Sequence, residues 1–187
     1  MTPHRIDYGD FFLMPLEASN IHSILEDFLA IYSDENVVRY SGFQLVENKE
    51  EAYKLLLKYA SKNDFYIWLI YHKQSLRYMG DISLTVDSYH HFASVGCFLR
   101  KDYWGRGIMA TSLKELLFYA FAEEGLHRVE AQVHELNYRS QLFFEKFGFV
   151  YEGTLKQNFF VDGTFYDSKL YRLLFDEYMN LYGKIDF

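Results

Sequence analysis

Trp104-Gly105-Arg106-Gly107-Ile108-Met109-Ala110 is the stretch of this 187-residue sequence that decides its fold. Its two glycines stand between an apolar alternation and a long amphipathic pattern. Glycine allows backbone turns that other residues resist, and it lets a ligand approach the chain closely. The first turn of a helix leaves N–H donors unpaired and carries partial positive charge. The stretch therefore predicts a strand, a glycine turn and a helix N-terminus, which together form a seat for phosphate or pyrophosphate.

Regular periodicity continues on both sides of the glycine turn. Before it, apolar residues alternate with other residues over 93–99, as in a half-buried strand. After it, apolar residues recur at helical spacing on one face: Ala110, Leu113, Leu116, Leu117, Ala120 and Phe121. Gly125 is expected to end this helix, residues 129–133 alternate as another strand, and Asn137 starts a short helix that stops at Gly148.

The remaining elements follow from the same patterns. Strands are predicted over residues 11–16, 65–71 and 77–86 and, as two closing strands, over 149–153 and 169–175. Helices are predicted over residues 21–29 and 49–61. The order β-α-α-β-β-β-α-β-α-β-β predicts a mixed α/β sheet with helices on its faces, in one domain that spans residues 1–187.

The composition narrows the class of protein. Hydrophobic residues make up 50% of the chain and charged residues 24%, which is typical of a globular domain. The net charge of −7 argues against a nucleic-acid partner. It suits a cationic substrate, and the alternative is an acidic surface without such a meaning, as in many soluble proteins. Cys97 is the single cysteine, so an internal disulfide is impossible. No apolar run is long enough for a membrane span and no signal-peptide pattern is present, so we expect a cytoplasmic protein without a membrane partner.

Four motifs, taken in order, resemble a known family. They are the glycine turn, His127-Arg128-Val129-Glu130-Ala131, Asn137-x-x-Ser140 and Gly148-Phe149, and together they resemble the GNAT acetyltransferase superfamily. Three further features are similar to its ribosomal-protein N-terminal acetyltransferase branch: Lys146 before Gly-Phe, the pair Glu152-Gly153, and Asp162-Gly163 followed by Asp167. The resemblance implies a mostly antiparallel sheet of about six to seven strands with helices on both faces. It also implies an enzyme that moves an acetyl group from acetyl-CoA to a primary amine without a metal.

The resemblance further implies where acetyl-CoA lies. The pyrophosphate is expected on the backbone amides from Gly105 to Ala110, and the pantetheine arm beside residues 97–99, where two neighbouring strands must separate. Four cations either neighbour the remaining phosphates or are simply solvated: Arg100, Lys101, Arg106 and Lys146. Asn137 is expected to cap its helix and orient the cofactor. The expected cofactor-binding residues are Cys97, Phe98, Leu99, Arg100, Trp104, Gly105, Arg106, Gly107, Ile108, Met109, Ala110, Asn137, Phe144 and Lys146.

Acetyl transfer also requires proton movements. An alkylammonium has a pKa near ~10, so it must lose a proton before attack, and the leaving thiolate must gain one. Many members of the superfamily use a Tyr of the short helix as the donor, but Phe144 stands at that position, so the resemblance moves the role to Ser140. The alternative for Ser140 is a hydroxyl bonded to the backbone at a helix start. His134, Glu135 and Glu152 are candidate bases by residue type, and a water relay is the alternative.

Departures from the family pattern leave other functions open. Trp104 replaces the usual Gln or Arg of the glycine turn, and Met109 replaces a Gly or Ala, although the backbone donors of the seat remain. A backbone N–H near Phe98 or Leu99 is expected to stabilise the oxyanion. Cys97 is read as a small buried hydrophobe, because no His-Asp partners accompany it as they would a nucleophile.

The acceptor is a protein N-terminus, a polyamine or another small amine. The alternatives are an acyltransferase that uses a longer acyl-CoA and a CoA-binding sensor that has lost catalysis. The oligomeric state is not readable.

Overall fold

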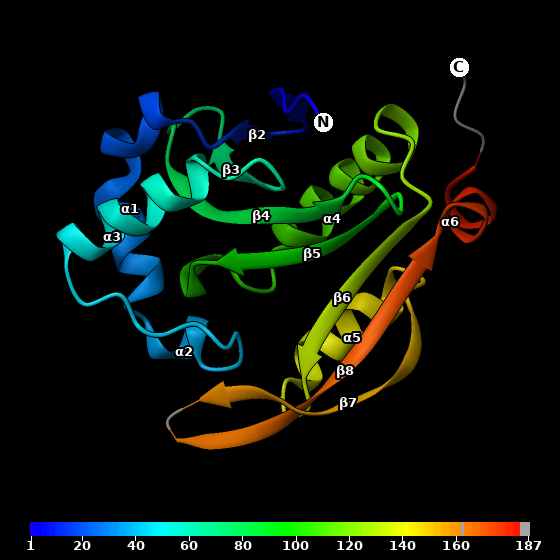
Figure 1. Cartoon of the computed structure of the whole chain (residues 1–187). Coiled ribbons are helices and arrows are strands. Elements are labelled where there is room, and N and C mark those ends of the chain that lie inside the picture. The colour runs from blue at the N-terminus through cyan, green and yellow to red at the C-terminus, as the bar shows by residue number, and fades with distance from the viewer. Residues whose placement is uncertain (162, 184–187) are drawn as a thin grey trace.

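The chain folds around one eight-stranded sheet, which a computed structural model describes together with its helices for residues 1–161 and 163–183 (Figure 1). In spatial order the strands run β1-β2-β3-β4-β5-β6-β8-β7. Neighbouring strands are antiparallel except β5 and β6, which are parallel. The strands are β1 (Ile6–Tyr8), β2 (Phe11–Pro15), β3 (Phe65–His72), β4 (Tyr78–Asp87), β5 (Phe92–Leu99), β6 (Arg128–His134), β7 (Val150–Val161) and β8 (Thr164–Leu174).

Helices cover both faces of the sheet, as predicted (Figure 1). The α-helices are α1 (Ile21–Tyr32), α2 (Glu35–Val38), α3 (Lys49–Ala60), α4 (Ile108–Phe118), α5 (Tyr138–Lys146) and α6 (Phe175–Tyr182). Short 3-10 turns lie at Ala18–Asn20 and Lys101–Tyr103, and a π-helical turn over Tyr119–Glu123 extends α4. Two of the predicted helix ends are confirmed. Asn137 caps α5 by accepting a hydrogen bond from the Ser140 N–H, and Gly125 follows α4 in the left-handed conformation.

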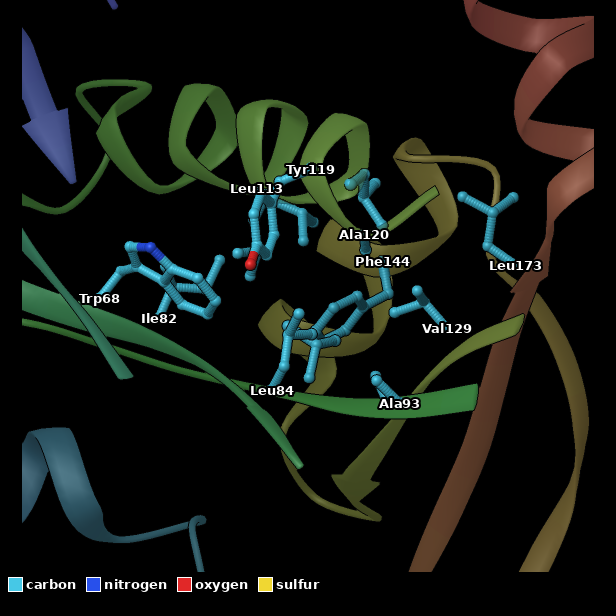
Figure 2. Close-up of a cluster of buried hydrophobic side chains, with 14 of the residues drawn as sticks. Trp68, Ile82, Leu84, Ala93, Leu113, Tyr119, Ala120, Val129, Phe144 and Leu173 are labelled. Carbon is cyan, nitrogen blue, oxygen red and sulfur yellow. The ribbon is translucent and has the colours of Figure 1, made fainter. Parts of the chain in front are cut away.

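Strand β3 shows how the sheet separates two apolar layers. Successive side chains of a strand point to opposite faces. Trp68 and Ile70 pack with α4 and α5, whereas Ile67 and Leu69 pack with α1 and α3. Figure 2 shows the first of these layers, in which Trp68 approaches Tyr119. The rings of Trp68 and Tyr119 meet edge to face with centroids 5.2 Å apart.

The sheet opens between its two parallel strands. Strand β5 pairs with β4 along its whole length, from Asp87↔Phe92 to Gly80↔Leu99. With β6 it pairs only from Phe92↔Arg128 to Ser94↔Glu130. Beyond Ser94 the two strands diverge, which is visible in Figure 1 as a widening gap between β5 and β6. This is the separation that the resemblance requires beside residues 97–99.

Several elements differ from the sequence predictions. The sheet has eight strands rather than about six to seven, because the three-residue strand β1 adds an edge that is too short for a period to reveal. The closing strands are far longer than predicted, since β7 and β8 continue outward as a mostly exposed hairpin in which Val161 pairs with Thr164. Helices α2 and α6 were also missed. Of the pair Asp162-Gly163, which the resemblance singled out, Asp162 lies outside the described residues, and Gly163 has a φ of +78°.

Candidate active site

The glycine turn leaves an open space at the start of α4. Gly105 and Gly107 have φ values of +75° and +76°, which side chains rarely adopt. A Cβ atom built on either glycine meets no other heavy atom within 4 Å. The first intrahelical bond of α4 runs from the Thr111 N–H to the Gly107 carbonyl at 3.0 Å, so the N–H groups of residues 108–110 precede the first internal donor. The turn therefore has both the free donors and the room that an anionic phosphate needs.

A cavity of about 350 Å³ lies beside this turn, at the opening between β5 and β6. Its wall joins three segments that are far apart in the sequence. Strand β5 contributes Cys97, Phe98 and Leu99, the glycine turn and α4 contribute Trp104 and Met109, and α5 contributes Asn137, Arg139, Ser140 and Phe143. Residues of α2 and the loop after it close the remaining side: Asn36, Val37, Arg39 and Tyr40. The cavity thus brings together six of the fourteen predicted cofactor neighbours and the predicted proton donor.

The backbone of β5 is oriented to receive an extended ligand. The Arg100 N–H donates to the Met79 carbonyl at 2.9 Å, which makes this a hydrogen-bonded pair of the antiparallel ladder. Such pairs alternate with non-bonded pairs. The main-chain groups of Cys97 and Leu99 are consequently directed away from β4 and toward the opening. The backbone N–H of Phe98, in contrast, faces β4. The backbone N–H of Leu99, rather than that of Phe98, is therefore suited to donate a hydrogen bond to an oxyanion.

Trp104 connects the glycine turn to the end of β5. Its indole Nε1–H donates to the Leu99 carbonyl oxygen at 2.7 Å. The Arg139 guanidinium lies over the same indole ring, 4.4 Å from the centroid. Trp104 therefore supports the cavity wall, and Arg139, which the sequence reasoning missed, adds a positive charge there. The motif Asn137-x-x-Ser140 was the available signal for Arg139, because it flanks that residue.

Ser140 lines the cavity. Its backbone N–H donates to the Asn137 Oδ1 at 3.2 Å, but its Oγ has no hydrogen bond to another described residue. The expected alternative, a hydroxyl held by the backbone, is therefore not what the described residues show. Phe144 lies in the core instead, 3% exposed, among Leu84, Ala93 and Val129 (Figure 2). The ring that lines the cavity from α5 is that of Phe143.

The predicted cations are spread around the site. Arg100 forms ion pairs with Asp102 at 3.1 Å and with Asp27 at 3.7 Å. Arg106 lies exposed beside the Tyr103 ring, and Lys146 lies in the last turn of α5. Neither Arg100, Arg106 nor Lys146 lines the cavity beside Ser140. Their roles toward distant phosphates stay predictions.

The three candidate bases are each held in other interactions. His134 accepts a hydrogen bond at Nδ1 from the Leu136 N–H at 3.1 Å, and burial lowers its pKa, so the neutral ring carries its proton on Nε2 and is a donor there. Glu135 accepts from the Asp167 N–H at 3.0 Å. Glu152 is bound by Arg128 at 2.6 Å and by Arg172 at 3.2 Å. Side-chain contacts to Arg128 and Arg172 hold the pKa of Glu152 below its usual range.

Two titratable groups lie on β4 and β5, a buried Asp81 and a half-buried Cys97. Burial raises the pKa of the Cys97 thiol to about 12, with a smaller contribution from Asp81, so Cys97 is protonated and unreactive, in line with its interpretation as a small hydrophobe. Asp81 is 2% exposed and accepts hydrogen bonds from Tyr32 and Tyr78. The sequence reasoning missed Asp81. A lone acid among the apolar residues of 78–86 was the signal for it.

Comparison with known proteins identifies the family. The sequence model of the acetyltransferase (GNAT) domain matches residues 12–150. The chain belongs to the GNAT acetyltransferase family. It is 27% identical over 153 residues to the uncharacterized N-acetyltransferase YoaA of Bacillus subtilis, with 80% of this chain and 86% of that protein covered. It is 26% identical over 149 residues to a spermidine N(1)-acetyltransferase of Vibrio cholerae, with 79% and 86% covered.

Solved structures of GNAT proteins share this fold. An acetyltransferase from T. thermophilus superposes with a TM-score of 0.82 at 26% identity, covering 97% of this chain and 94% of that one. The spermidine N-acetyltransferase of Vibrio cholerae in complex with CoA and spermine superposes with a TM-score of 0.78 at 23% identity, covering 91% and 99%. The predicted resemblance is thereby confirmed, and this GNAT protein is an acyltransferase that takes acetyl-CoA as co-substrate. None of the helices in its described residues has the length and apolar character needed to cross a membrane.

Proposed function

We propose that this chain moves the acetyl group of acetyl-CoA to a cationic primary amine, with the pyrophosphate seated on Gly105–Ala110 and Ser140 protonating the leaving thiolate. The observation that carries the proposal is the cavity in which Cys97, Leu99 and Ser140 meet at the opening between β5 and β6. The phosphate seat adjoins it through Met109 and Trp104.

Each part of the reaction has a candidate group in this cavity. The amine nitrogen attacks the thioester carbonyl carbon, and the carbonyl oxygen becomes negatively charged. This oxygen accepts a hydrogen bond from the Leu99 backbone N–H, a donor that is already in place. The carbon–sulfur bond then breaks, and the thiolate takes the proton of Ser140 Oγ, which solvent replaces. Because His134, Glu135 and Glu152 are all engaged elsewhere, the ammonium loses its first proton to water before attack. The nitrogen gives its second proton to solvent as the neutral amide forms.

The acceptor class follows from charge. The chain carries a net charge of −7, which attracts cations. A spermidine N(1)-acetyltransferase is among its relatives, which supports a small cationic amine as the acceptor. The open position of the cavity between α2 and α5 leaves a peptide N-terminus as a second acceptor to test.

Thiol release from acetyl-CoA tests the proposal when it is measured with a panel of amines and combined with mass detection of the acetylated product. We expect release to depend on a primary amine, to proceed with chelator present, and to be faster with acetyl-CoA than with longer acyl-CoA. Binding of acetyl-CoA without release on any amine would instead identify a sensor. Faster turnover of a longer acyl-CoA would identify a different acyl donor.

A further inference from the structure

A second cavity lies on the other face of β4 and β5, under α1 and α3. It has a volume of about 180 Å³, and five of its twelve lining residues are aromatic, among them Tyr32, Phe43, Tyr59 and Phe98. Its floor carries the Asp81 carboxyl group. Phe98 lines both this cavity and the one beside Ser140, so the two cavities share this residue in their walls.

Asp81 is a buried carboxyl group without a cationic partner among the described residues. Its Oδ1 accepts from the Tyr32 hydroxyl at 3.0 Å, and its Oδ2 accepts from the Tyr78 hydroxyl at 2.6 Å. None of the ion pairs that the described part of the chain forms involves Asp81, although it is 2% exposed. Buried carboxylates are almost always paired with a positive charge. Each oxygen of a carboxylate accepts more than one hydrogen bond, so Asp81 has acceptor capacity left for a cation.

The groups around Asp81 are those that hold an ammonium ion. Burial raises the pKa of Asp81 to about 6, so the carboxyl group is still mostly ionised at neutral pH. The titratable groups that face it are Tyr32, Tyr59, Tyr78 and Cys97, and none of these is cationic. Aromatic faces attract ammonium ions, most strongly where water is excluded.

We infer that this cavity binds a second ammonium group of the acceptor, one that is not acetylated, with Asp81 as its counter-ion. The inference rests on the proposed acetyl transfer and names the substrate class as a linear diamine or polyamine. One ammonium stays at Asp81, while the alkyl chain passes Phe98 and presents the other amine to the cavity beside Ser140. Asp81 then determines specificity without taking part in the chemistry.

Kinetics with two amines of equal chain length test this assignment. Putrescine carries a second ammonium and n-butylamine does not. Asp81→Asn is expected to raise the KM of putrescine by about tenfold or more, and to change the KM of n-butylamine and of acetyl-CoA by less than about twofold. Asp87→Asn is the matched control, because it removes the same charge from the exposed end of the same strand, and both KM values should stay at those of the parent. An equal change for putrescine and n-butylamine would overturn the inference.

Calorimetric titration with putrescine alone separates this inference from the proposed function. The parent and Asp87→Asn should bind putrescine without acetyl-CoA, whereas Asp81→Asn should bind it about tenfold more weakly or not at all. Thr85→Lys is a second variant, because Thr85 lines the cavity from an exposed position and a lysine there supplies an ammonium of its own. It should abolish putrescine binding and leave acetyl-CoA binding intact. Putrescine binding that is unchanged in both variants overturns the inference, whereas binding without thiol release defeats only the proposed function.

Discussion

The indole N–H of Trp104 donates a 2.7 Å hydrogen bond to the carbonyl oxygen of Leu99. This bond ties the glycine turn to the strand along which the pantetheine arm is proposed to lie. Trp104 is a departure from the family pattern, and its hydrogen bond holds the glycine turn, the proposed phosphate seat, against β5. The Arg139 guanidinium, stacked on the indole, extends the connection to α5.

Replacing Trp104 by Phe should weaken acetyl-CoA binding. The variant keeps a ring for Arg139 but removes the donor to Leu99. A neutral hydrogen bond contributes about 0.5–1.5 kcal/mol. Calorimetry should therefore show a Kd that is about two- to tenfold higher. Tyr103→Phe, at the neighbouring ring, should bind like the parent. Equal affinities of Trp104→Phe and the parent would show that the bond does not support the seat.

Removal of the Ser140 hydroxyl should slow the reaction more than it affects binding. Assistance by a positioned proton donor is typically worth ~10²–10⁴-fold, so Ser140→Ala should lower kcat by at least about tenfold if chemistry limits the rate. The KM of acetyl-CoA should change little, because the phosphate seat is untouched. Tyr138→Phe removes an exposed hydroxyl from the same helix turn and is the matched control. A parent-like kcat for Ser140→Ala, with chemistry shown to be rate-limiting, would leave water as the donor to the thiolate.

The buried Asp81 should make stability depend on pH in a defined direction. Burial raises the pKa of Asp81 from 3.8 to about 6 in the folded protein. Between these two values the folded protein holds a proton that the unfolded chain has lost. The contribution of Asp81 to the free energy of unfolding is therefore present in full below about pH 4 and is lost as the pH rises through about 6. Two pKa units correspond to about 3 kcal/mol.

Urea unfolding at a series of pH values measures this effect. Asp81→Asn cannot titrate, so its stability relative to the parent should rise by about 3 kcal/mol from pH ~4 to pH ~7. Asp87 is the opposite case, because its contact with His90 lowers its pKa below 3.8. Its titration therefore falls near and below pH ~4, and Asp87→Asn should show no such rise relative to the parent between pH ~4 and pH ~7. A constant difference between Asp81→Asn and the parent across this range would mean that Asp81 titrates normally.

Elements with a regular apolar period could be predicted from the sequence. The alternation over 93–99 became β5, and the helical spacing after Gly107 became α4. Helix α2 could not be predicted, because four residues carry no period, and its buried residue Val38 belongs to a cluster that includes residues of α1 and α3. The outer part of the β7–β8 hairpin was missed for a related reason. Most of its side chains are exposed, so the strands persist through pairing with each other rather than through an apolar pattern.

The candidate site likewise has parts that local sequence motifs predict and parts that depend on long-range packing. The glycine turn and Asn137-x-x-Ser140 are local in the sequence, and the structure places both motifs at one cavity. The far wall at Asn36 and Tyr40 depends on where α2 packs, which no local pattern states. The engagement of Glu152 is likewise long-range, since its partner Arg128 lies on β6, across the intervening strand β8.

Acetyl-CoA binding to Gly107→Glu tests the central claim most directly. A glutamate at this position places a side chain and a negative charge in the proposed phosphate seat. Gly125→Glu is the matched control, because Gly125 also has a positive φ and open space at its Cβ but lies at the other end of the same helix. Calorimetry should show parent-like affinity for Gly125→Glu and no detectable binding for a folded Gly107→Glu. Parent-like affinity for a folded Gly107→Glu would contradict the placement of the coenzyme on the glycine turn.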